Sequence, residues 1–464
     1  MKNDRRTFIM KTGIVGMGLL GTAGCNVKQE NKKYVPEIQL KTGSGSVAFT
    51  QIPDRIAGMT LEQLRDDYKD RVFNQYLPFW DKGGIDYERG GFMCELNDDG
   101  SVFNDEKYLW YQGRGLWVYS FLFNNFGRDK RYLEIAQKTR DFILTHMYLG
   151  DGKWRESVNR SGIPVKSTVA QGPAKAIYGA LFVAAGLTEL YRAERNENDL
   201  NLAKTTLWSS IREYESPDYE GIIIEGLNQK GLRMQGHSFM IVWILTNLLS
   251  IHSDPQLEEL QTEHVNHLIN DFWNSKYNIV NETLYHDYSR IPDYDSSMQI
   301  GHSIESLWMV IDESLRKNDR ALFEKCKNRI RHIIEMGWDY VFEGLCSETF
   351  HVFGSEKNCP GPDYDLKVMW AHAELLIATM KILELTGEVW AKEWYERTRE
   401  FCLKNLANTT NGVWREAVNR FGENKKRPII SVYRKDNFHP IRYLMLNLLA
   451  IERMIQNNNI PALK

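Results

Sequence analysis

The sequence lacks a strong excess of charge of either sign. Its 464 residues include 58 Lys and Arg and 61 Asp and Glu, which gives a formal net charge of -3. Without a basic field, the composition argues against nucleic acid as a partner. None of the six cysteines forms a CxxC pair, so a structural zinc site is not expected. Disulfides would be permitted in an exported protein, but the cysteine spacing does not require them.

The chain also lacks an apolar run long enough to span a bilayer near its N-terminus. Residues 5–11 (RRTFIMK) resemble a twin-arginine export signal, and the apolar run at 12–20 is too short for a mature membrane helix. Residues 21–25 (GTAGC) resemble a lipobox ending at Cys25. We therefore expect a periplasmic or membrane-anchored bacterial lipoprotein, with an export signal at 1–25 and a polar tether at 26–50. Membrane contact is expected only through the lipid anchor, and homodimerisation is left open.

Residues 50–460 contain no Pro/Gly-rich linker or charge run, but they contain an internal repeat. Residues 154–162 (WRESVNRSG) recur as residues 414–422 (WREAVNRFG), with seven of nine positions identical. Looser copies occur at residues 91–100, 224–231, 284–290 and 345–354. Taking Asn97, Asn159, Asn228, Ser289, Gly354 and Asn419 as equivalent gives spacings of 62, 69, 61, 65 and 65 residues. Each copy reads as a short β-like run followed by a polar turn.

Two amphipathic helical patterns lie between successive copies of the repeat. The predicted helix pairs are 110–126 with 132–147, 174–195 with 200–214, 239–252 with 257–273, 303–315 with 321–341, 368–385 with 389–406, and 440–456 with 61–73. A roughly constant period of helix pairs is typical of a closed repeat. The sequence therefore predicts one all-α catalytic domain at 51–464, an (α/α)6 toroid with β-hairpin-like loops walling a cleft at one end.

The starts of the predicted inner helices carry titratable residues. These are Arg114, His237, His302, His372 and His439. His302 and Glu305 are three residues apart, so both project from one side of the first turn. For any one histidine, a structural role is an equally good interpretation. Four of the 11 histidines at corresponding helix starts favour a functional cluster at the cleft floor.

Five motifs in a fixed order carry a family resemblance. They are residues 90–92 (GGF), 111–114 (YQGR), 301–305 (GHSIE), 370–374 (WAHAE) with 384–387 (ELTG), and 438–442 (FHPIR). From about Tyr68 to Ile455 the chain resembles the N-acylglucosamine 2-epimerase family, which includes cellobiose 2-epimerases and aldose–ketose isomerases. The resemblance implies an (α/α)6 barrel in which His302 and His439 are catalytic, joined by Arg114 and His237.

Histidine suits the chemistry that this resemblance implies. Epimerising or isomerising a reducing sugar needs proton abstraction next to the open-chain carbonyl by a base that titrates near the operating pH. Arg114 would stabilise the developing oxyanion, and no metal or other cofactor is required. The expected partner is a small carbohydrate. Its predicted binding residues are Tyr111, Glu305, Trp308, Trp370, His372 and Glu374.

Two alternatives remain open at this point. A glycoside hydrolase or lyase on the same fold would need two carboxylates about 5–10 Å apart, for which Glu305 with Glu374 or Glu348 could serve. A non-catalytic glycan-binding lipoprotein would keep the aromatic residues, 12% of the chain, without gathering histidines. The observation that separates these hypotheses is whether histidines or a bare carboxylate pair converge at the cleft floor. The sugar, and epimerase against isomerase, are left open.

Overall fold

The computed structural model describes residues 48–165, 177–221, 229–349, 366–407, 412–424 and 433–463. Residues Ser46–Lys464 form one compact, mostly helical unit. The predicted export signal, nearly all of the predicted tether, and the predicted turn positions Asn228 and Gly354 lie outside the described residues. None of the helices in the described part of the chain combines the length and apolar character needed to cross a membrane.

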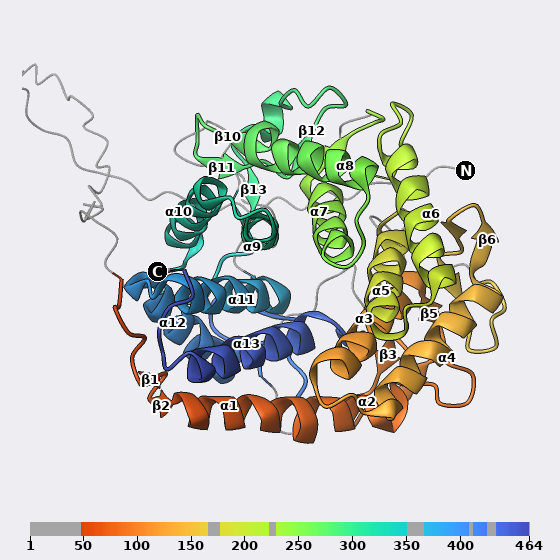
Figure 1. The fold of residues 1–464 in the computed structure, drawn as a ribbon, viewed down its shortest axis with the longest axis horizontal. Coiled ribbons are helices and arrows are strands. Elements are labelled where there is room, and N and C mark those ends of the chain that lie inside the picture. The colour runs from red at the N-terminus through yellow and green to blue at the C-terminus, as the bar shows by residue number, and fades with distance from the viewer. Residues whose placement is uncertain are drawn as a thin grey trace, which may run out of the picture. The chain divides into compact units, whose positions relative to one another are not determined.

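The helices alternate along the chain between an inner and an outer set (Figure 1). The inner set is α3 (Leu109–Asn125), α5 (Tyr178–Glu194), α7 (Gln235–Leu249), α9 (Ile300–Arg316), α11 (Met369–Thr386) and α13 (His439–Gln456). The outer set is α1 (Leu61–Asp70), α4 (Lys130–His146), α6 (Glu197–Tyr214), α8 (Pro255–Asn266), α10 (Arg320–Gly337) and α12 (Val389–Asn405). A π-helical segment, Arg71–Tyr76, joins α1 to α2 (Leu77–Gly83), and another, His267–Asp271, extends α8. The predicted helices are confirmed, with ends displaced by a few residues.

Burial follows the position of each helix. Inner helix α7 is buried on nearly all sides, which matches its continuous apolar run from Phe239 to Leu245. Outer helix α10 buries one stripe, with Phe323, Ile330 and Ile334 facing inward. Inner helices α3 and α5 approach closely because Gly113 lacks a side chain. A Cβ there would lie 2.5 Å from the carbonyl carbon of Phe182.

Short antiparallel strand pairs link neighbouring helix pairs at one end of the inner helices. They are β5 (Lys107–Tyr108) with β8 (Ser157–Val158), β9 (Arg233–Met234) with β12 (Thr283–Leu284), β13 (Met298–Gln299) with β14 (Glu348–Thr349), and β15 (Lys367–Val368) with β16 (Ala417–Val418). In each pair the first strand immediately precedes an inner helix, and the second lies in the loop that leads to the next inner helix. The N-termini of α3, α7, α9 and α11 are therefore each tied by backbone hydrogen bonds to the loop that follows the next outer helix.

The remaining strands form local hairpins. They are β1 (Arg55–Ile56) with β2 (Met59–Thr60), β3 (Glu95–Leu96) with β4 (Val102–Asn104), β6 (Tyr148–Gly150) with β7 (Lys153–Trp154), and β10 (Trp273–Asn274) with β11 (Ile279–Val280). The loop before α3 also contacts the loop before α13. The N–H of Leu96 donates to the carbonyl of Tyr433 at 2.7 Å, and the backbones of Glu95 and Arg434 form an isolated antiparallel β-bridge. This contact joins the two ends of the helical series.

The predicted turn positions are correct at Asn97, Asn159 and Asn419. At each of them, the asparagine carbonyl accepts the N–H of the glycine three residues later, at 2.9–3.0 Å. The equivalence proposed for Ser289 is wrong. The N–H of Tyr285 donates to the carbonyl of Ser289 at 2.9 Å, so Ser289 ends the turn that Tyr285 begins. This copy has lost the asparagine and glycine that mark the others, so the sequence alone placed it four residues too late.

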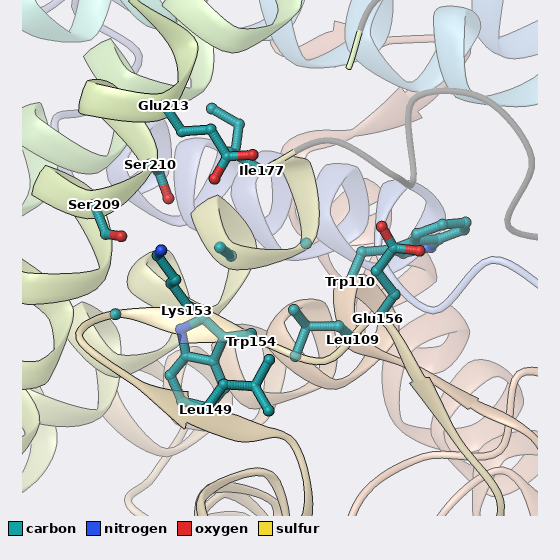
Figure 2. A pocket seen from close by; sticks show the side chains of 13 residues that line it. Leu109, Trp110, Leu149, Lys153, Trp154, Glu156, Ile177, Ser209, Ser210 and Glu213 are labelled. Atoms are coloured by element: carbon teal, nitrogen blue, oxygen red, sulfur yellow. The ribbon is translucent and has the colours of Figure 1, made fainter. Parts of the chain in front are cut away.

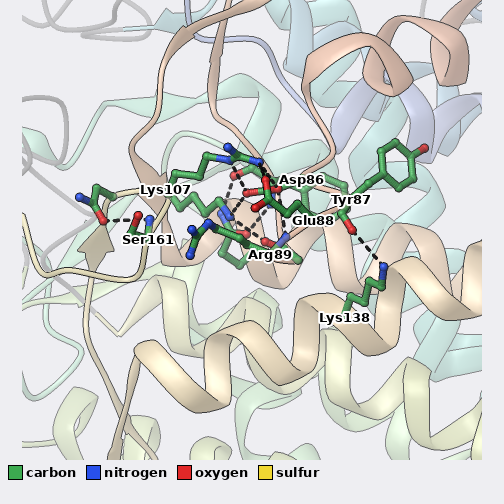
Figure 3. Close-up of polar contacts among 12 residues, drawn as sticks. Asp86, Tyr87, Glu88, Arg89, Lys107, Lys138 and Ser161 are labelled. Carbon is green, nitrogen blue, oxygen red and sulfur yellow. Dashed lines mark hydrogen bonds and ion pairs between the residues drawn. The ribbon is translucent and has the colours of Figure 1, made fainter.

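A buried lysine anchors two of these loops. Nζ of Lys107 donates to Oδ2 of Asp86 at 2.9 Å and to the carbonyl of Gly90 at 2.7 Å, and Figure 3 shows this cluster. The same arrangement recurs before α11, where Nζ of Lys367 donates to Asp339 at 2.9 Å. Both lysines are fully buried, so each needs its carboxylate partner. The pairs fix the strands that lead into α3 and α11.

Candidate active site

Corresponding residues of the inner helices form layers spaced three residues apart. The third residues of α3, α7, α9 and α11 are Tyr111, His237, His302 and Ala371. The sixth residues are Arg114, Met240, Glu305 and Glu374. The ninth residues of α3, α7 and α9 are Trp117, Trp243 and Trp308. Residues three apart lie about 60° apart around a helix, so neighbouring layers of one helix project toward nearly the same side.

Two tryptophans of the third layer pack together with Phe438. Trp117 contacts Trp243 with ring centroids 5.3 Å apart, and Phe438 packs edge-on against both. Trp308 is 1% exposed, and its Nε1 donates to Oε2 of Glu374 at 2.9 Å. The only polar side-chain atom of Trp308 is therefore bonded to Glu374.

A buried guanidinium joins the two carboxylates of the second layer. Nη2 of Arg442 donates to Oε1 of Glu305 and to Oε1 of Glu374, both at 2.5 Å. Burial would raise the pKa of Glu374, but Arg442 and His439 outweigh it and keep the pKa below its usual value. Glu305, Glu374 and His439 also offer atoms within 4.8 Å of one another, a grouping that could hold a metal ion. Arg442 already supplies the positive charge between these carboxylates.

His439 begins α13 and is fixed at both ring nitrogens. Its Nδ1 lies 2.9 Å from Oε1 of Glu374, and its Nε2 lies 3.3 Å from Nη2 of Arg114. A carboxylate only accepts and a guanidinium only donates, so Nδ1 carries the proton and Nε2 is the acceptor. Asp436 orients the backbone by accepting the N–H of His439 at 2.7 Å, and it also pairs with Arg114. This tautomer leaves a basic nitrogen directed at Arg114.

His302 lies in the first turn of α9 and has a carboxylate partner of its own. Its Nδ1 lies 2.8 Å from Oε1 of Glu282. Its ring packs against Trp370 with centroids 4.9 Å apart, and Trp370 also contacts the ring of His439 at 5.9 Å. Gly301 permits this contact, because a Cβ there would lie 2.5 Å from Cζ3 of Trp370. The structure thus brings His302 and His439 around one tryptophan.

His237 lies in a buried aromatic enclosure. Its Nε2 is 3.1 Å from the hydroxyl of Tyr219, and its ring stacks on Tyr214 with centroids 5.1 Å apart. Burial, and secondarily the proximity of His302, lowers the pKa of His237 to about 3. The imidazole is therefore neutral at physiological pH and poorly suited to accept a proton. His237 forms part of the wall beside His302.

His372, which was predicted to bind substrate, contacts the backbone through both of its ring nitrogens. Its Nε2 accepts the N–H of Leu345 at 2.9 Å, and its Nδ1 donates to the carbonyl of Val368 at 2.7 Å. Gln112 of α3 makes the matching pair of backbone contacts. Both residues are the fourth of their helix, one position beyond the layer of His302, which turns them by about 100°. The two backbone contacts of His372 join α11 to the loop at Leu345.

Tyr111 is 1% exposed, and burial raises its pKa well above the usual value. Its backbone carbonyl accepts a hydrogen bond from Nδ2 of Asn437 at 3.0 Å, which ties α3 to the start of α13.

Three site residues were given no role from the sequence: Glu282, Asp436 and Arg442. Arg442 had a usable signal, because it follows His439 by three residues as Glu305 follows His302.

A cavity of about 270 Å³ lies outside this site, between α5, α6 and the β6–β7 hairpin. Figure 2 shows Ser209, Ser210 and Glu213 on one side of it and Trp110 on the other. Its lining contains no histidine among the described residues. A cavity of about 220 Å³ behind Trp414 occupies the corresponding place in the last repeat. These spaces follow from the geometry of the repeat.

The family match and the relatives that follow define an enzyme of the carbohydrate epimerase and isomerase class, which acts on a small sugar. The chain belongs to the N-acylglucosamine 2-epimerase (GlcNAc 2-epimerase) family, whose model matches residues 90–440. It is 24% identical over 379 residues to N-acylglucosamine 2-epimerase of Rattus norvegicus, covering 77% of this chain and 85% of that protein.

Two solved structures have a similar fold. Cellobiose 2-epimerase from Bacillus thermoamylovorans B4167 aligns with a TM-score of 0.69 and 20% identity, over 84% of this chain and 100% of that one. A D-mannose isomerase aligns with a TM-score of 0.65 and 16% identity, over 86% of this chain and 97% of that one. Both matches concern the fold alone.

Proposed function

We propose that this enzyme epimerises or isomerises a reducing mono- or disaccharide, with His302 and His439 exchanging protons at the carbon next to the open-chain carbonyl. The observation that carries the proposal is the matched pair of histidines, each with Nδ1 on a carboxylate and each in contact with Trp370. A carboxylate on Nδ1 orients the ring and stabilises the imidazolium formed when Nε2 takes a proton.

In this proposal one histidine removes the proton and the electron pair moves to the carbonyl oxygen, which forms an enediolate. Arg114 stabilises that oxygen by donating to it in place of Nε2 of His439, 3.3 Å away, and this leaves the Nε2 lone pair to exchange the proton. Reprotonation of the same carbon from the opposite face inverts it and gives the epimer. Reprotonation at the neighbouring carbon gives the aldose–ketose isomer. The carboxylates of Glu305 and Glu374 position Arg442 and His439 rather than reacting themselves.

The carboxylate-pair hydrolysis weighed from the sequence is disfavoured by the same contacts. A general acid in glycoside hydrolysis needs a raised pKa so that it stays protonated. The pKa of Glu374 is instead kept low, because Arg442 and His439 outweigh the effect of burial. Glu305 shares the same guanidinium. Both Glu305 and Glu374 are therefore paired with Arg442.

Deuterium labelling tests this proposal directly. Incubation in D₂O with mannose, glucose, N-acetylglucosamine, N-acetylmannosamine or a β-1,4-linked disaccharide is expected to place deuterium at the carbon next to the carbonyl of at least one sugar. Two histidines on opposite faces would label the inverted product almost completely, whereas a single base would return part of the original proton. NMR of the recovered sugar measures both. Cleavage of a glycosidic bond without carbon-bound label would contradict the proposal.

We also propose the (α/α)6 toroid as the closed form of this fold. The support is the alternation of inner and outer helices, the strand pairs between successive helix pairs, and the contact of Leu96 with Tyr433 that joins the two ends. The residues of the proposed site then lie at the end where the inner helices begin.

Export and lipid anchoring complete the proposal. The motive is the twin-arginine-like run at 5–11 followed by Cys25 in a lipobox-like setting. Mass spectrometry of bacterial membrane fractions is expected to find a mature chain that begins at a diacylated Cys25. Replacing Cys25 by alanine should release the protein from the membrane. Soluble protein that retains Met1 in the unaltered strain would exclude anchoring.

A further inference from the structure

A second carboxylate stands in the same relation to His302 as Glu374 does to His439. Oε1 of Glu282 lies 2.8 Å from Nδ1 of His302, and Oε2 accepts Nε2 of Gln235 at 2.6 Å. The carboxylate can only accept, so His302 donates its Nδ1 proton to it. Among the described residues, His302 is the one basic side chain within ion-pair distance of Glu282. Glu282 thus differs from Glu374, whose charge is shared with Arg442.

The backbone around Glu282 is fixed on both sides. On one side, the carbonyl of Glu282 accepts the N–H of Gln235 at 3.0 Å, next to the β9–β12 strand pair. On the other side, Asn281 is 1% exposed, and its Nδ2 donates to the carbonyls of Asp295 and Ser297 at 2.9 and 3.1 Å. A carboxylate on so constrained a loop costs little further ordering when it contacts a histidine.

The position of Glu282 is occupied by glutamate in most of the loops that can be compared. In successive loops the first backbone N–H of an inner helix donates to the residue that precedes the second strand. The accepting residues are Glu156, Glu282, Ser347 and Glu416. Glu156 and Glu416 belong to the two clearest copies of the repeat. The repeat framework thus places this glutamate at the N-terminal end of the inner helices, and there Glu282 meets His302.

We propose that Glu282, anchored by Gln235, is a positioning residue for the reaction, which fixes the His302 ring with Nδ1 protonated, so that Nε2 is the nitrogen that exchanges the substrate proton. This inference rests on the proposed function, in which His302 exchanges that proton. His302 and His439 then have the same arrangement, in which Nδ1 of each ring contacts one carboxylate. Loss of its charge weakens His302 as a base without removing either histidine.

Replacing Glu282 by glutamine tests this role, because it keeps the shape and removes the charge. We expect kcat to fall by about 10- to 100-fold with KM nearly unchanged. The acid limb of the pH profile should move to lower pH by about one unit, because an imidazolium without its carboxylate loses its proton more easily. Glu282→Asp keeps the charge and should restore the position of the acid limb even where kcat stays low.

Glu263→Gln is the matched control, since it removes the carboxylate beside His267 on an outer helix, and it should change neither quantity. A Glu282→Gln enzyme with wild-type kcat and pH profile would overturn the inference. NMR titration of the His302 ring separates this failure from that of the proposed function. If the wild type exchanges deuterium into no sugar, the proposed function fails. The difference in His302 pKa between wild type and Glu282→Gln then still decides whether Glu282 governs the ring.

Discussion

Replacing either His302 or His439 by asparagine is expected to lower turnover by 10²- to 10⁴-fold, the range that general acid–base groups contribute. Asparagine retains a donor for the carboxylate behind each ring but has no basic nitrogen in the place of Nε2. The backbone contacts of His439 with Asp436 do not depend on its side chain and should persist. The measurement is the rate of deuterium incorporation from D₂O into the sugar that the wild-type enzyme labels.

The control for these variants is His252→Asn, at a partly exposed position that follows α7. It should exchange deuterium at the wild-type rate. Circular dichroism and thermal melting of all three variants would show whether the helical fold is kept. More than about a tenth of wild-type turnover in either site variant would exclude that histidine as an acid or base. Full exchange in one variant and none in the other would identify a single-base isomerase.

More of the fold than of the site could be predicted from the sequence. The repeat period and the helical patterns predicted the helices because both depend on local sequence, namely apolar spacing and turn residues. The helix predicted to begin at Phe239 begins at Gln235 in the structure. The prediction missed the first four residues because Gln235 to Ser238 are polar or small. In the structure these residues are buried all the same, since α7 is enclosed on nearly all sides. Sequence patterns that assume one exposed face miss the first turn of such a helix.

The site was predictable where it depends on spacing within one helix. The pair His302 and Glu305 was placed correctly on one face, because three-residue spacing fixes that relation. His372, also predicted as a site residue, lies one position later in α11 than His302 does in α9, and its ring contacts backbone groups. A single step of about 100° separates a residue that faces the centre from one that faces the preceding loop.

Partners from different helix pairs could not be predicted from one sequence. The contact between His302 and Glu282 joins residues 20 apart through a loop, and the contact between Arg442 and Glu305 joins residues 137 apart. Neither follows from any local pattern. Glu282 had one indirect signal, its place in a degenerate copy of the repeat. That signal was hidden because the copy was aligned four residues too late, on Ser289 instead of Tyr285.

Acidification from pH 7 to pH 5 is expected to cost the folded protein about 5 kcal/mol of stability, before most carboxylates titrate. Burial lowers the pKa of His237, His264 and His372 to about 3 each. In the unfolded chain these histidines titrate near pH 6.5, so between about pH 6.5 and 3 the unfolded state binds up to three more protons. Stability therefore falls as pH falls through this window, by about 1.4 kcal/mol per pH unit for each histidine.

Urea unfolding at a series of pH values between 7.5 and 5 measures this slope, and His264→Leu assigns it. Neither ring nitrogen of His264 has a hydrogen-bond partner among the described residues, so leucine removes the titration without breaking a hydrogen bond. Burial first, then His267 and Arg233, lower the pKa of His264 and outweigh Glu215, whose carboxylate lies 3.9 Å away. His264→Leu should therefore flatten the slope by about one proton, whereas His252→Leu at a partly exposed position should leave it unchanged. A slope that is the same in wild type and His264→Leu would show that His264 can bind a proton in the folded state.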